Sequence, residues 1–527
     1  MVAAEMVVAP LDSPVLITVV LAFLLVVITL LVSFSTRRSS SNAPRLRLPP
    51  SPRGLPVVGH LHLLGSLPHR SLRSLAASHG PVMHLRLGRV STVVASSAAA
   101  AEEAMKTRDV DFAGRPRLLM VDRFYYGNGG IGFAPYGEHW RQARRVCAVH
   151  MLSARRVASL GRVRAQEAAA LLDRVRRAGG VVNLSDSLVV YSNAVISRCT
   201  LGGAGCGVEE GGGDGARLRK AFGEMEELLG TVPMGESVPW LGWVDTVTGL
   251  ERRAKRVFEE MDGLLERVIA DHRQRRRAGA GAATVHEEDF VDVMLDAGEL
   301  DTDSIKSIIL DVLAAATAST FALLERAMAE LINHPHEMRR LQAEVRAAVA
   351  PGAVVTEADL PRLPYLKAVV NETLRLHPPA PLLLPRETVE DTRLQGHDVP
   401  AGTRVLINAW AIGRDPAAWG SRAEEFAPER FVGDELGGGA GRGFSFLPFG
   451  GGRRGCPGVE FAMLSNALAL ASLVHGFDWE VPGHGGVGGR RTPPVDMSEL
   501  YGLSVCLKAP LLLVAKTWPS VGLPSTQ

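Results

Sequence analysis

A single cysteine lies in an unusually glycine-rich stretch, FSFLPFGGGRRGCPGVEFAML, at residues 444–464. A structural zinc site would need further cysteine or histidine ligands close in sequence, but the nearest candidates are His475 and Cys506. A phosphate-binding loop would end its glycines with a lysine followed by serine or threonine, and this stretch does not. The residue types therefore disfavour both a zinc site and a phosphate site.

Two kinds of thiol chemistry remain open at Cys456. A helix predicted to begin near Pro457, together with Arg453 and Arg454, would lower the thiol pKa, as a nucleophilic cysteine requires. The same positive potential suits a thiolate bound to iron, because glycines let backbone amides approach the sulfur and Arg454 would face an anionic haem edge. Chemistry alone leaves the nucleophile and the iron ligand as alternatives.

Four motifs favour the iron ligand by resemblance to a known family. Residues 449–458, FGGGRRGCPG, match every fixed position of the haem loop of the cytochrome P-450 family, F-x-x-G-x-R-x-C-x-G. Three further segments resemble that family's W-x-x-x-R helix, its E-x-x-R helix and the clamp that follows: WRQAR at 140–144, ETLR at 372–375 and PERF at 428–431. The chain thus resembles cytochromes P-450, and in particular the plant microsomal A-type members.

The resemblance implies a fold, a cofactor and a set of cofactor contacts. The fold would be mainly α-helical with a minor β-sheet, and the cofactor would be haem b, with Cys456 as the ligand of its iron. Trp140, Arg144 and Arg386 match positions that contact the haem propionates. Phe449 and Arg454 belong to the haem loop itself and complete the expected cofactor-binding set.

Glu372 and Arg375 lie one turn apart on a predicted helix with apolar neighbours. An exposed pair of this kind would contribute only about 0.2–0.5 kcal/mol, but unpaired charges in a buried helix are costly. A third group should therefore complete the network, and the resemblance nominates Arg430. We expect this network to hold the architecture around the cysteine loop, without a catalytic role.

A long apolar segment at 303–333 predicts a helix that ends before Pro335. By resemblance this helix crosses the distal face of the haem, where the family pattern A-G-x-D-T-T supplies an acid and an alcohol for proton delivery. Residues 315–320, AATAST, align with that pattern. Ala318 then stands at the acid position, and Ser319 and Thr320 are the candidate catalytic residues.

The missing acid leaves three functional alternatives. In the favoured one, the protein is a monooxygenase whose protons pass through Ser319, Thr320 or ordered water. In the second, it is a haem-dependent isomerase or dehydratase that needs no oxygen activation. In the third, it is a catalytically weak haem-binding protein.

The N-terminal end predicts a membrane anchor. Residues 15–34, VLITVVLAFLLVVITLLVSF, form a charge-free run long enough for a helix to cross about 30 Å of hydrocarbon. Arg37 and Arg38 follow this run directly, so that flank should stay cytosolic. We predict a single-pass protein of the endoplasmic reticulum membrane with four regions: a lumenal N-terminus at 1–14, a transmembrane helix at 15–34, a basic and proline-rich hinge at 35–60 and a cytosolic haem-binding catalytic domain at 61–527.

Composition and periodicity describe the rest of the chain. A net charge of +2 gives no sign of nucleic-acid binding, and five scattered cysteines fit reduced thiols. Three glycine-rich stretches, at 202–215, 278–283 and 433–443, are expected to be solvent loops. Hydrophobic spacing predicts two strands within 82–96, helices near 97–107, 137–152, 153–178, 250–277, 303–333, 335–349 and 364–377, and late strands at 404–409 and 503–515.

The resemblance also implies partners: NADPH–cytochrome P-450 reductase as electron donor, O2, membrane lipid and a small lipophilic substrate of specialised metabolism. Arg442, Arg453 and Arg454 are candidates for a basic docking surface, with Arg454 better assigned to the haem. The expected substrate-pocket walls are 118–124, Met234, 309–316, 382–384 and 500–503.

Overall fold

The fold is known from a computed structural model, which describes most of the chain after the hinge. The predicted anchor at 15–34 lies outside the described residues except for five positions, and most of the glycine-rich stretches lie outside them as well. Residues 213–215, expected in a loop, instead begin helix α9 (Gly213–Leu229). The described residues are 46–127, 130–202, 213–278, 288–434, 442–483 and 494–518, with Thr18, Leu21, Ala22, Leu25 and Val26.

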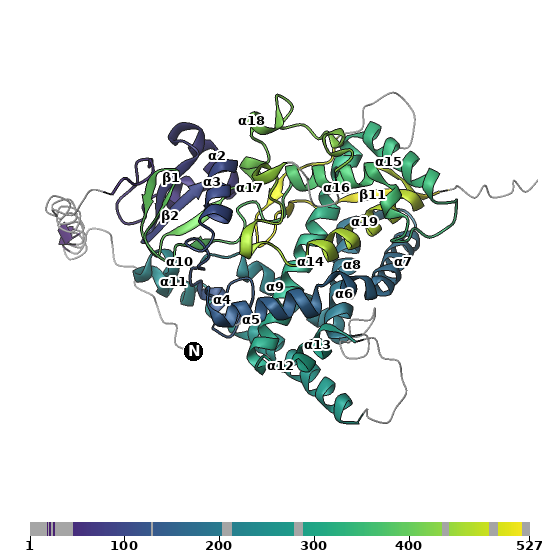
Figure 1. Cartoon of the computed structure of the whole chain (residues 1–527), viewed down its shortest axis with the longest axis horizontal. Helices are drawn as coiled ribbons and strands as arrows, with labels where there is room; N and C mark the ends of the chain where they lie inside the picture. Colours follow the sequence, from purple (N-terminus) through teal and green to yellow (C-terminus); the bar gives the residue numbers. More distant parts are fainter. Residues whose placement is uncertain are drawn as a thin grey trace, which may run out of the picture.

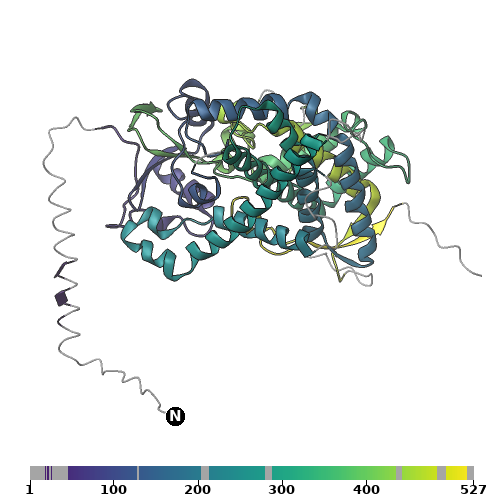
Figure 2. The ribbon, with the colours of Figure 1, turned by 90° about the horizontal axis from the view of Figure 1, so that it is seen from below.

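Four long helices form the centre of the molecule. Helix α14 packs on α8 and α19, and α7 packs on the same two helices, so their apolar side chains meet in one large core. Figure 1 shows α14 in the middle of the helical part, with the small sheet around β1 and β2 to one side, and Figure 2 shows the same division from below. The four helices are α7 (Gly161–Ala178), α8 (Leu184–Leu201), α14 (Thr302–Asn333) and α19 (Val459–Gly476).

Helix α14 is apolar on nearly all sides and is enclosed by protein. It begins where the Asp301 side chain accepts the Ser304 backbone N–H, and it ends before Pro335, which occupies the first position of α15 (Pro335–Ala348). Among the described residues, α14 and α19 are long and apolar enough to cross a membrane, but both are mostly buried. Their hydrophobicity is therefore explained by the core that they form.

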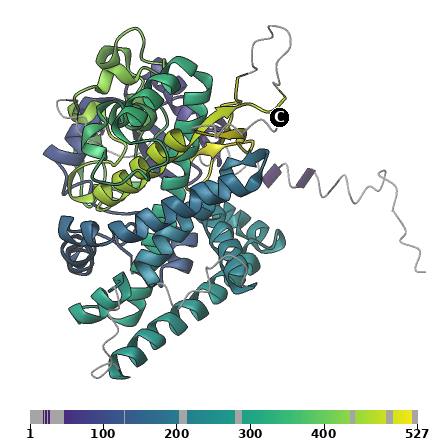
Figure 3. The same cartoon turned by 90° about the vertical axis from the view of Figure 1, so that its right-hand side faces the viewer.

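A mixed sheet forms the other part of the molecule. Strands β1 (Val82–Leu87) and β2 (Val90–Ala95) pair as the predicted hairpin, β7 (Arg404–Ile407) runs parallel to β2, and β4 (Arg386–Glu387) pairs with β7. A second sheet has β11 between β3 and β8, and Figure 3 shows its yellow C-terminal strands beside the blue helices. The other strands are β3 (Val181–Asn183), β5 (Thr392–Leu394), β6 (His397–Val399), β8 (Phe477–Glu480), β9 (Glu499–Leu500), β10 (Cys506–Leu507) and β11 (Leu512–Thr517).

The remaining helices complete the mainly helical fold that the sequence predicts. The expected helical segments are present within a few residues, whereas α2, α4, α8 to α11, α13, α17 and α18 were not expected. These helices are α2 (Pro68–His79), α3 (Ala98–Glu102), α4 (Leu119–Phe124), α5 (Glu138–Val146), α6 (Ala154–Ser159), α10 (Met234–Ser237), α11 (Gly242–Val247), α12 (Leu250–Ala278), α13 (Phe290–Ala297), α16 (Pro364–Leu376), α17 (Ala409–Ile412) and α18 (Pro416–Trp419).

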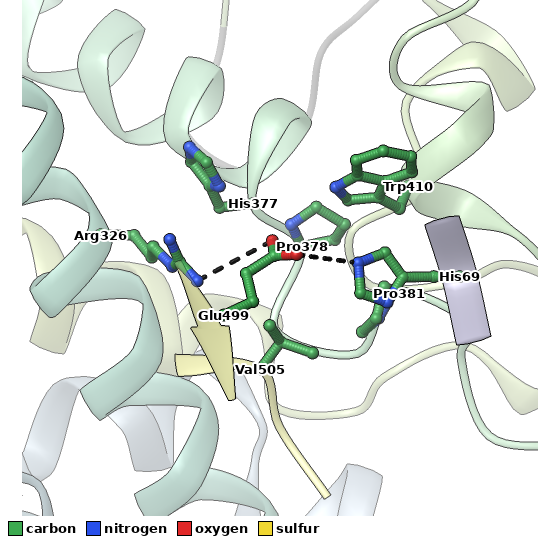
Figure 4. A pocket seen from close by; sticks show the side chains of 8 residues that line it. All are labelled: His69, Arg326, His377, Pro378, Pro381, Trp410, Glu499 and Val505. Atoms are coloured by element: carbon green, nitrogen blue, oxygen red, sulfur yellow. Dashed lines mark hydrogen bonds and ion pairs between the residues drawn. The ribbon is translucent and has the colours of Figure 1, made fainter. Parts of the chain in front are cut away.

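Two buried ionic networks join distant parts of the chain. Glu372 and Arg375 on α16 are both fully buried and paired at 2.6 Å, and Arg430 lies 3.4 Å from Glu372, so the predicted third group is in place. In the second network, Glu499 contacts His69 of α2 at 3.2 Å and Arg326 of α14 at 3.8 Å, as Figure 4 shows. Because unpaired charges would be costly here, each network fixes the segments that it joins.

Candidate active site

One cavity of about 310 Å³ lies between the cysteine loop and α14. The loop contributes Cys456 and Phe449, and α14 contributes a wall of small residues that includes Ala315 and Ala316. All eight predicted site residues line this single cavity, although they come from four separate stretches of sequence: Trp140, Arg144, Ser319, Thr320, Arg386, Phe449, Arg454 and Cys456.

The cysteine loop needs its glycines for backbone geometry. Gly450 and Gly452 have φ angles of 67° and 65°, in the left-handed region that favours glycine. A Cβ at Gly452 would lie 2.0 Å from the carbonyl oxygen of Met105, so a side chain there would clash with backbone. The turn closes where the Cys456 backbone N–H donates to the Phe449 carbonyl at 2.9 Å.

The environment of the Cys456 sulfur differs from the sequence-based expectation in one respect. Helix α19 begins at Val459, slightly later than predicted. Burial raises the pKa of the Cys456 thiol, while the Gly458 amide and the charge of Arg144 act in the opposite direction. Cys456 nevertheless keeps solvent-accessible surface, and it lines the cavity. The positive potential predicted around the sulfur is present but does not outweigh burial.

Arginine side chains converge on the cavity beside the cysteine. Arg144 donates to the Gly455 carbonyl at 2.7 Å, and Arg386 donates to Gly451 at 3.0 Å. Arg454 turns inward, donates to Ala134 at 2.7 Å and stacks over the Trp140 ring at 4.3 Å. A fourth cation, Arg115, also lines the cavity, and the sequence analysis missed it.

Comparison with known proteins identifies the family. A family model for cytochrome P450 matches residues 49–492. The (+)-menthofuran synthase of Mentha piperita is 44% identical over 504 residues, covering 94% of this chain and 98% of its own length. Cytochrome P450 71A1 of Persea americana is 44% identical over 468 residues, covering 87% of this chain and 91% of its own.

The chain belongs to the cytochrome P450 family. It is a monooxygenase of that family, and haem is its cofactor. A zebra fish cytochrome P450 solved with abiraterone has a TM-score of 0.71 at 25% identity, over 86% of this chain and 99% of that chain. The observed P450 fold therefore agrees with the family assignment.

The cavity residues of this P450 fit a haem. Burial, followed by repulsion from Arg454 and Arg386, lowers the pKa of Arg115 well below its usual range. Burial and repulsion from Arg386 and Arg144 likewise lower the pKa of Arg454 to about 9. Buried cations that repel one another need anions beside them, and the two propionates of a haem are such anions.

The distal wall carries the two predicted hydroxyls. Ser319 lines the cavity and donates its hydroxyl proton to the Ala315 carbonyl at 2.7 Å, which leaves its oxygen lone pairs available as acceptors. Thr320 also lines the cavity and is 3% exposed. Ala318 is 7% exposed and does not belong to the described residues that line the cavity. The acid position of the family pattern therefore lies behind the wall.

The expected substrate-pocket walls are only partly correct. Residues 312 and 314–316 line the cavity, as do Leu383, Leu384 and Leu503. Residues 118–124 are not part of its described lining, because α4 packs its buried side chains into the core, and Met234 is 41% exposed. Tyr125, directly after α4, lines the cavity instead.

The predicted docking arginines divide into two groups. Arg454 faces the cavity, which agrees with its assignment to the haem. Arg453 and Arg442 keep side-chain exposures of 42% and 34%, although Arg453 is paired with Asp109 at 2.8 Å and Arg442 lies 3.5 Å from Asp434. Two of the three therefore remain at the surface.

Asp311 is a carboxylate on the cavity wall; it lies in the expected wall 309–316, but the sequence analysis did not single out its acid group. It lies on α14 and is 7% exposed. Burial raises its pKa to about 6, although hydrogen bonds from the Gly132 and Ile131 amides act in the opposite direction. A lone acid inside an otherwise apolar stretch of this helix is a sequence signal that would have found it.

Proposed function

We propose that this P450 binds haem through a thiolate bond from Cys456 and inserts one oxygen atom from O2 into a small lipophilic substrate. The observation that carries the proposal is the position of Cys456 on a cavity that four arginines also line, of which Arg115 and Arg386 are buried. When bound, the haem supplies the oxygen activation. Electrons would come from NADPH through a membrane-bound reductase, for which the partly exposed Arg442 and Arg453 are candidate contacts.

The chain's own residues would divide the remaining work. Arg115, Arg144, Arg386 and Arg454 would hold the propionates and so orient the cofactor. On the opposite side, Ser319 and Thr320 would hold a line of hydroxyl groups or water molecules along which protons move. Because position 318 is an alanine, it supplies no carboxylate to this line.

The proposed substrate is an apolar compound of specialised metabolism. The wall near α14 is built from small and aliphatic side chains, including Val312, Ala316, Leu384 and Leu503. Such a lining favours a compact apolar or aromatic molecule. The similarity to a plant (+)-menthofuran synthase supports a substrate of this class.

We further propose that the catalytic domain sits on the endoplasmic reticulum membrane, anchored by residues 15–34. Trp240 and Trp243 lie in the segment formed by the short 3-10 helix η5 (Pro239–Leu241) and α11, and they are 65% and 62% exposed, which is unusual for tryptophan. A hydrogen bond from Arg89 N–H to the Ser237 carbonyl at 3.0 Å ties this region to the β1–β2 turn. The Gly88 N–H of the same turn donates to the Val58 carbonyl in the hinge at 3.1 Å, so this turn contacts both the hinge and the segment that carries the exposed tryptophans.

The central test is the carbon monoxide difference spectrum of the reduced protein. The wild-type protein should give the long-wavelength Soret band of a thiolate-ligated haem, and Cys456→Ala should lose it. Cys506→Ala is the matched control, because Cys506 lies outside the described cavity lining and should keep the band. A wild-type spectrum without the thiolate band, or full turnover with the reductase omitted, would contradict the proposed function.

A further inference from the structure

Asp311 is a buried carboxylate on the cavity wall that the proposed mechanism does not use. Its Oδ2 accepts hydrogen bonds from the backbone N–H groups of Ile131 at 2.5 Å and Gly132 at 3.0 Å. The hydroxyl of Tyr125 also bonds to this carboxylate. Asp311 therefore ties the distal helix α14 to a loop segment, residues 130–134, that lies far away in the sequence.

The carbonyl oxygens of the same segment hold the side chains that face the predicted propionate site. Its N–H groups thus point to the acid on α14, while its C=O groups accept hydrogen bonds from the opposite side. The bonds are Arg115 Nε to the Gly132 carbonyl at 2.8 Å, Trp140 Nε1 to the Ile131 carbonyl at 3.0 Å and an Arg454 nitrogen to the Ala134 carbonyl at 2.7 Å.

Glycine residues make this approach possible. A Cβ at Gly130 would lie 2.3 Å from Asp311 Oδ2, and a Cβ at Gly132 would lie 3.3 Å from Asp311 Oδ1. The first distance is a clash, and the second is a tight contact. The two glycines therefore let the segment close onto the carboxylate, whose negative charge also faces the cation of Arg115.

We propose that Asp311 is a positioning residue, which holds segment 130–134 so that Arg115 and Arg454 are correctly placed for the haem propionates. Ile131 of the same segment lines the cavity, so its place there depends on the same bonds. The inference rests on the proposed function only in assigning the propionates to these arginines. The attachment of the segment to α14 stands on the hydrogen bonds alone.

The first test compares Asp311→Asn with a matched control on the same helix. An asparagine side chain has one acceptor oxygen, and its NH2 group would face backbone donors. Hydrogen exchange at the Ile131 and Gly132 amides should rise at least about tenfold, because charge-assisted bonds are lost. Transfer of haem from the holoprotein to apomyoglobin should accelerate by about several-fold, because the same hydrogen bonds no longer hold the segment that positions Arg115 and Arg454.

The control is Glu325→Gln. Glu325 is a buried acid on α14 that accepts the Leu507 N–H at 2.8 Å and the Ser185 hydroxyl at 2.5 Å, outside the described cavity lining. This variant should lose stability without faster exchange in segment 130–134 and without faster haem transfer. Equal exchange and equal haem transfer in the two variants would overturn the proposal.

A double-mutant cycle tests the contact itself. Gly130→Ala should accelerate haem transfer in the wild-type background, because the added methyl group displaces the segment from Asp311. In an Asp311→Ala background the clash is gone, so the same change should have a much smaller effect. If the effects of the two substitutions on the rate of haem transfer were strictly additive, the proposed role of this contact would be wrong. A wild-type protein without the thiolate band but with protected Ile131 and Gly132 amides would instead count against the proposed function alone.

Discussion

At the scale of single residues, the cavity combines a cysteine and several arginines with a wall of small side chains. Cys456 is the one cysteine of its loop, and the cations around it lower one another's pKa. On the opposite wall, alanines leave space and Ser319 supplies a hydroxyl without the restricted side chain of threonine. In the proposed mechanism the charged groups would hold the cofactor, while proton transfer would depend on hydroxyl groups and water.

Ser319 gives a prediction at this scale. Ser319→Ala removes a cavity hydroxyl, so product formed per NADPH consumed should fall by about tenfold or more, with peroxide released instead. Ser319→Thr keeps the hydroxyl and should retain coupling close to that of the wild type. The measurement is NADPH consumption and product in the reductase-reconstituted system. Unchanged coupling in Ser319→Ala would exclude this hydroxyl from the proton path.

At the scale of elements, buried charges hold together segments that packing alone would not align. Glu499 at the start of β9 joins α2 and α14, and its side chain is 3% exposed (Figure 4). Burial raises the pKa of the Glu499 carboxyl. Hydrogen bonds from His69 and Arg70, together with the charge of Arg70, outweigh burial and lower this pKa to about 2. The ionised form is therefore favoured in the folded protein.

This shift has a defined pH dependence. Because the folded-state pKa lies below the unfolded value, the contribution of Glu499 to stability is present above about pH 4.5 and is lost as the pH falls towards about 2. At pH 7, Glu499→Gln should lower the free energy of unfolding by about 3 kcal/mol, since it removes the anion that faces the buried Arg326 and the half-exposed Arg70.

Chemical unfolding at several pH values measures this contribution. The difference between wild type and Glu499→Gln should shrink below about pH 4.5. Glu480→Gln is the control, because Glu480 pairs with Lys516 at 44% and 58% exposure and should cost at most about 1 kcal/mol. A difference that stays constant with pH would contradict the proposed ionic role.

At the scale of the whole molecule, the described chain has one helical core and one sheet region, with the cavity beneath α14. The exposed tryptophans of the η5–α11 segment lie on the hinge side of the molecule. A membrane surface would cover them, since tryptophan is favoured at the boundary between lipid and water. The anchor and this surface would then fix the orientation of the domain on the membrane.

Vesicle binding tests this arrangement. A variant lacking residues 1–45 should still associate weakly with phospholipid vesicles, and replacing Trp240 and Trp243 by serine should reduce that binding at least about tenfold. Val432→Ser is the control, because Val432 is 49% exposed and belongs to a different part of the chain, after α18. Equal vesicle binding by the truncated protein and its serine variant would argue against membrane contact at this surface.

Much of the architecture could be predicted from local sequence patterns. The β1–β2 hairpin and helices α14, α15 and α16 are found where spacing and proline residues predict them. Helices α10 and α11 escaped prediction, because their short segments carry too little periodicity to identify. The α4 region was wrongly placed in the cavity wall, since burial in a core and exposure to a cavity favour the same apolar residues.

By itself the sequence determined the reaction class and nominated eight site residues, which the structure brings to one cavity, because a cysteine loop of this kind and its motifs permit few substitutions in residue type or spacing. Only the tertiary structure decided that Arg115 belongs to the site, that Asp311 binds the segment that holds Arg115, and that Ala318 lies outside the described cavity lining. Ile131 and Asp311 are 180 residues apart yet directly hydrogen-bonded. Contacts of this kind depend on how helices pack, and local residue patterns do not encode them.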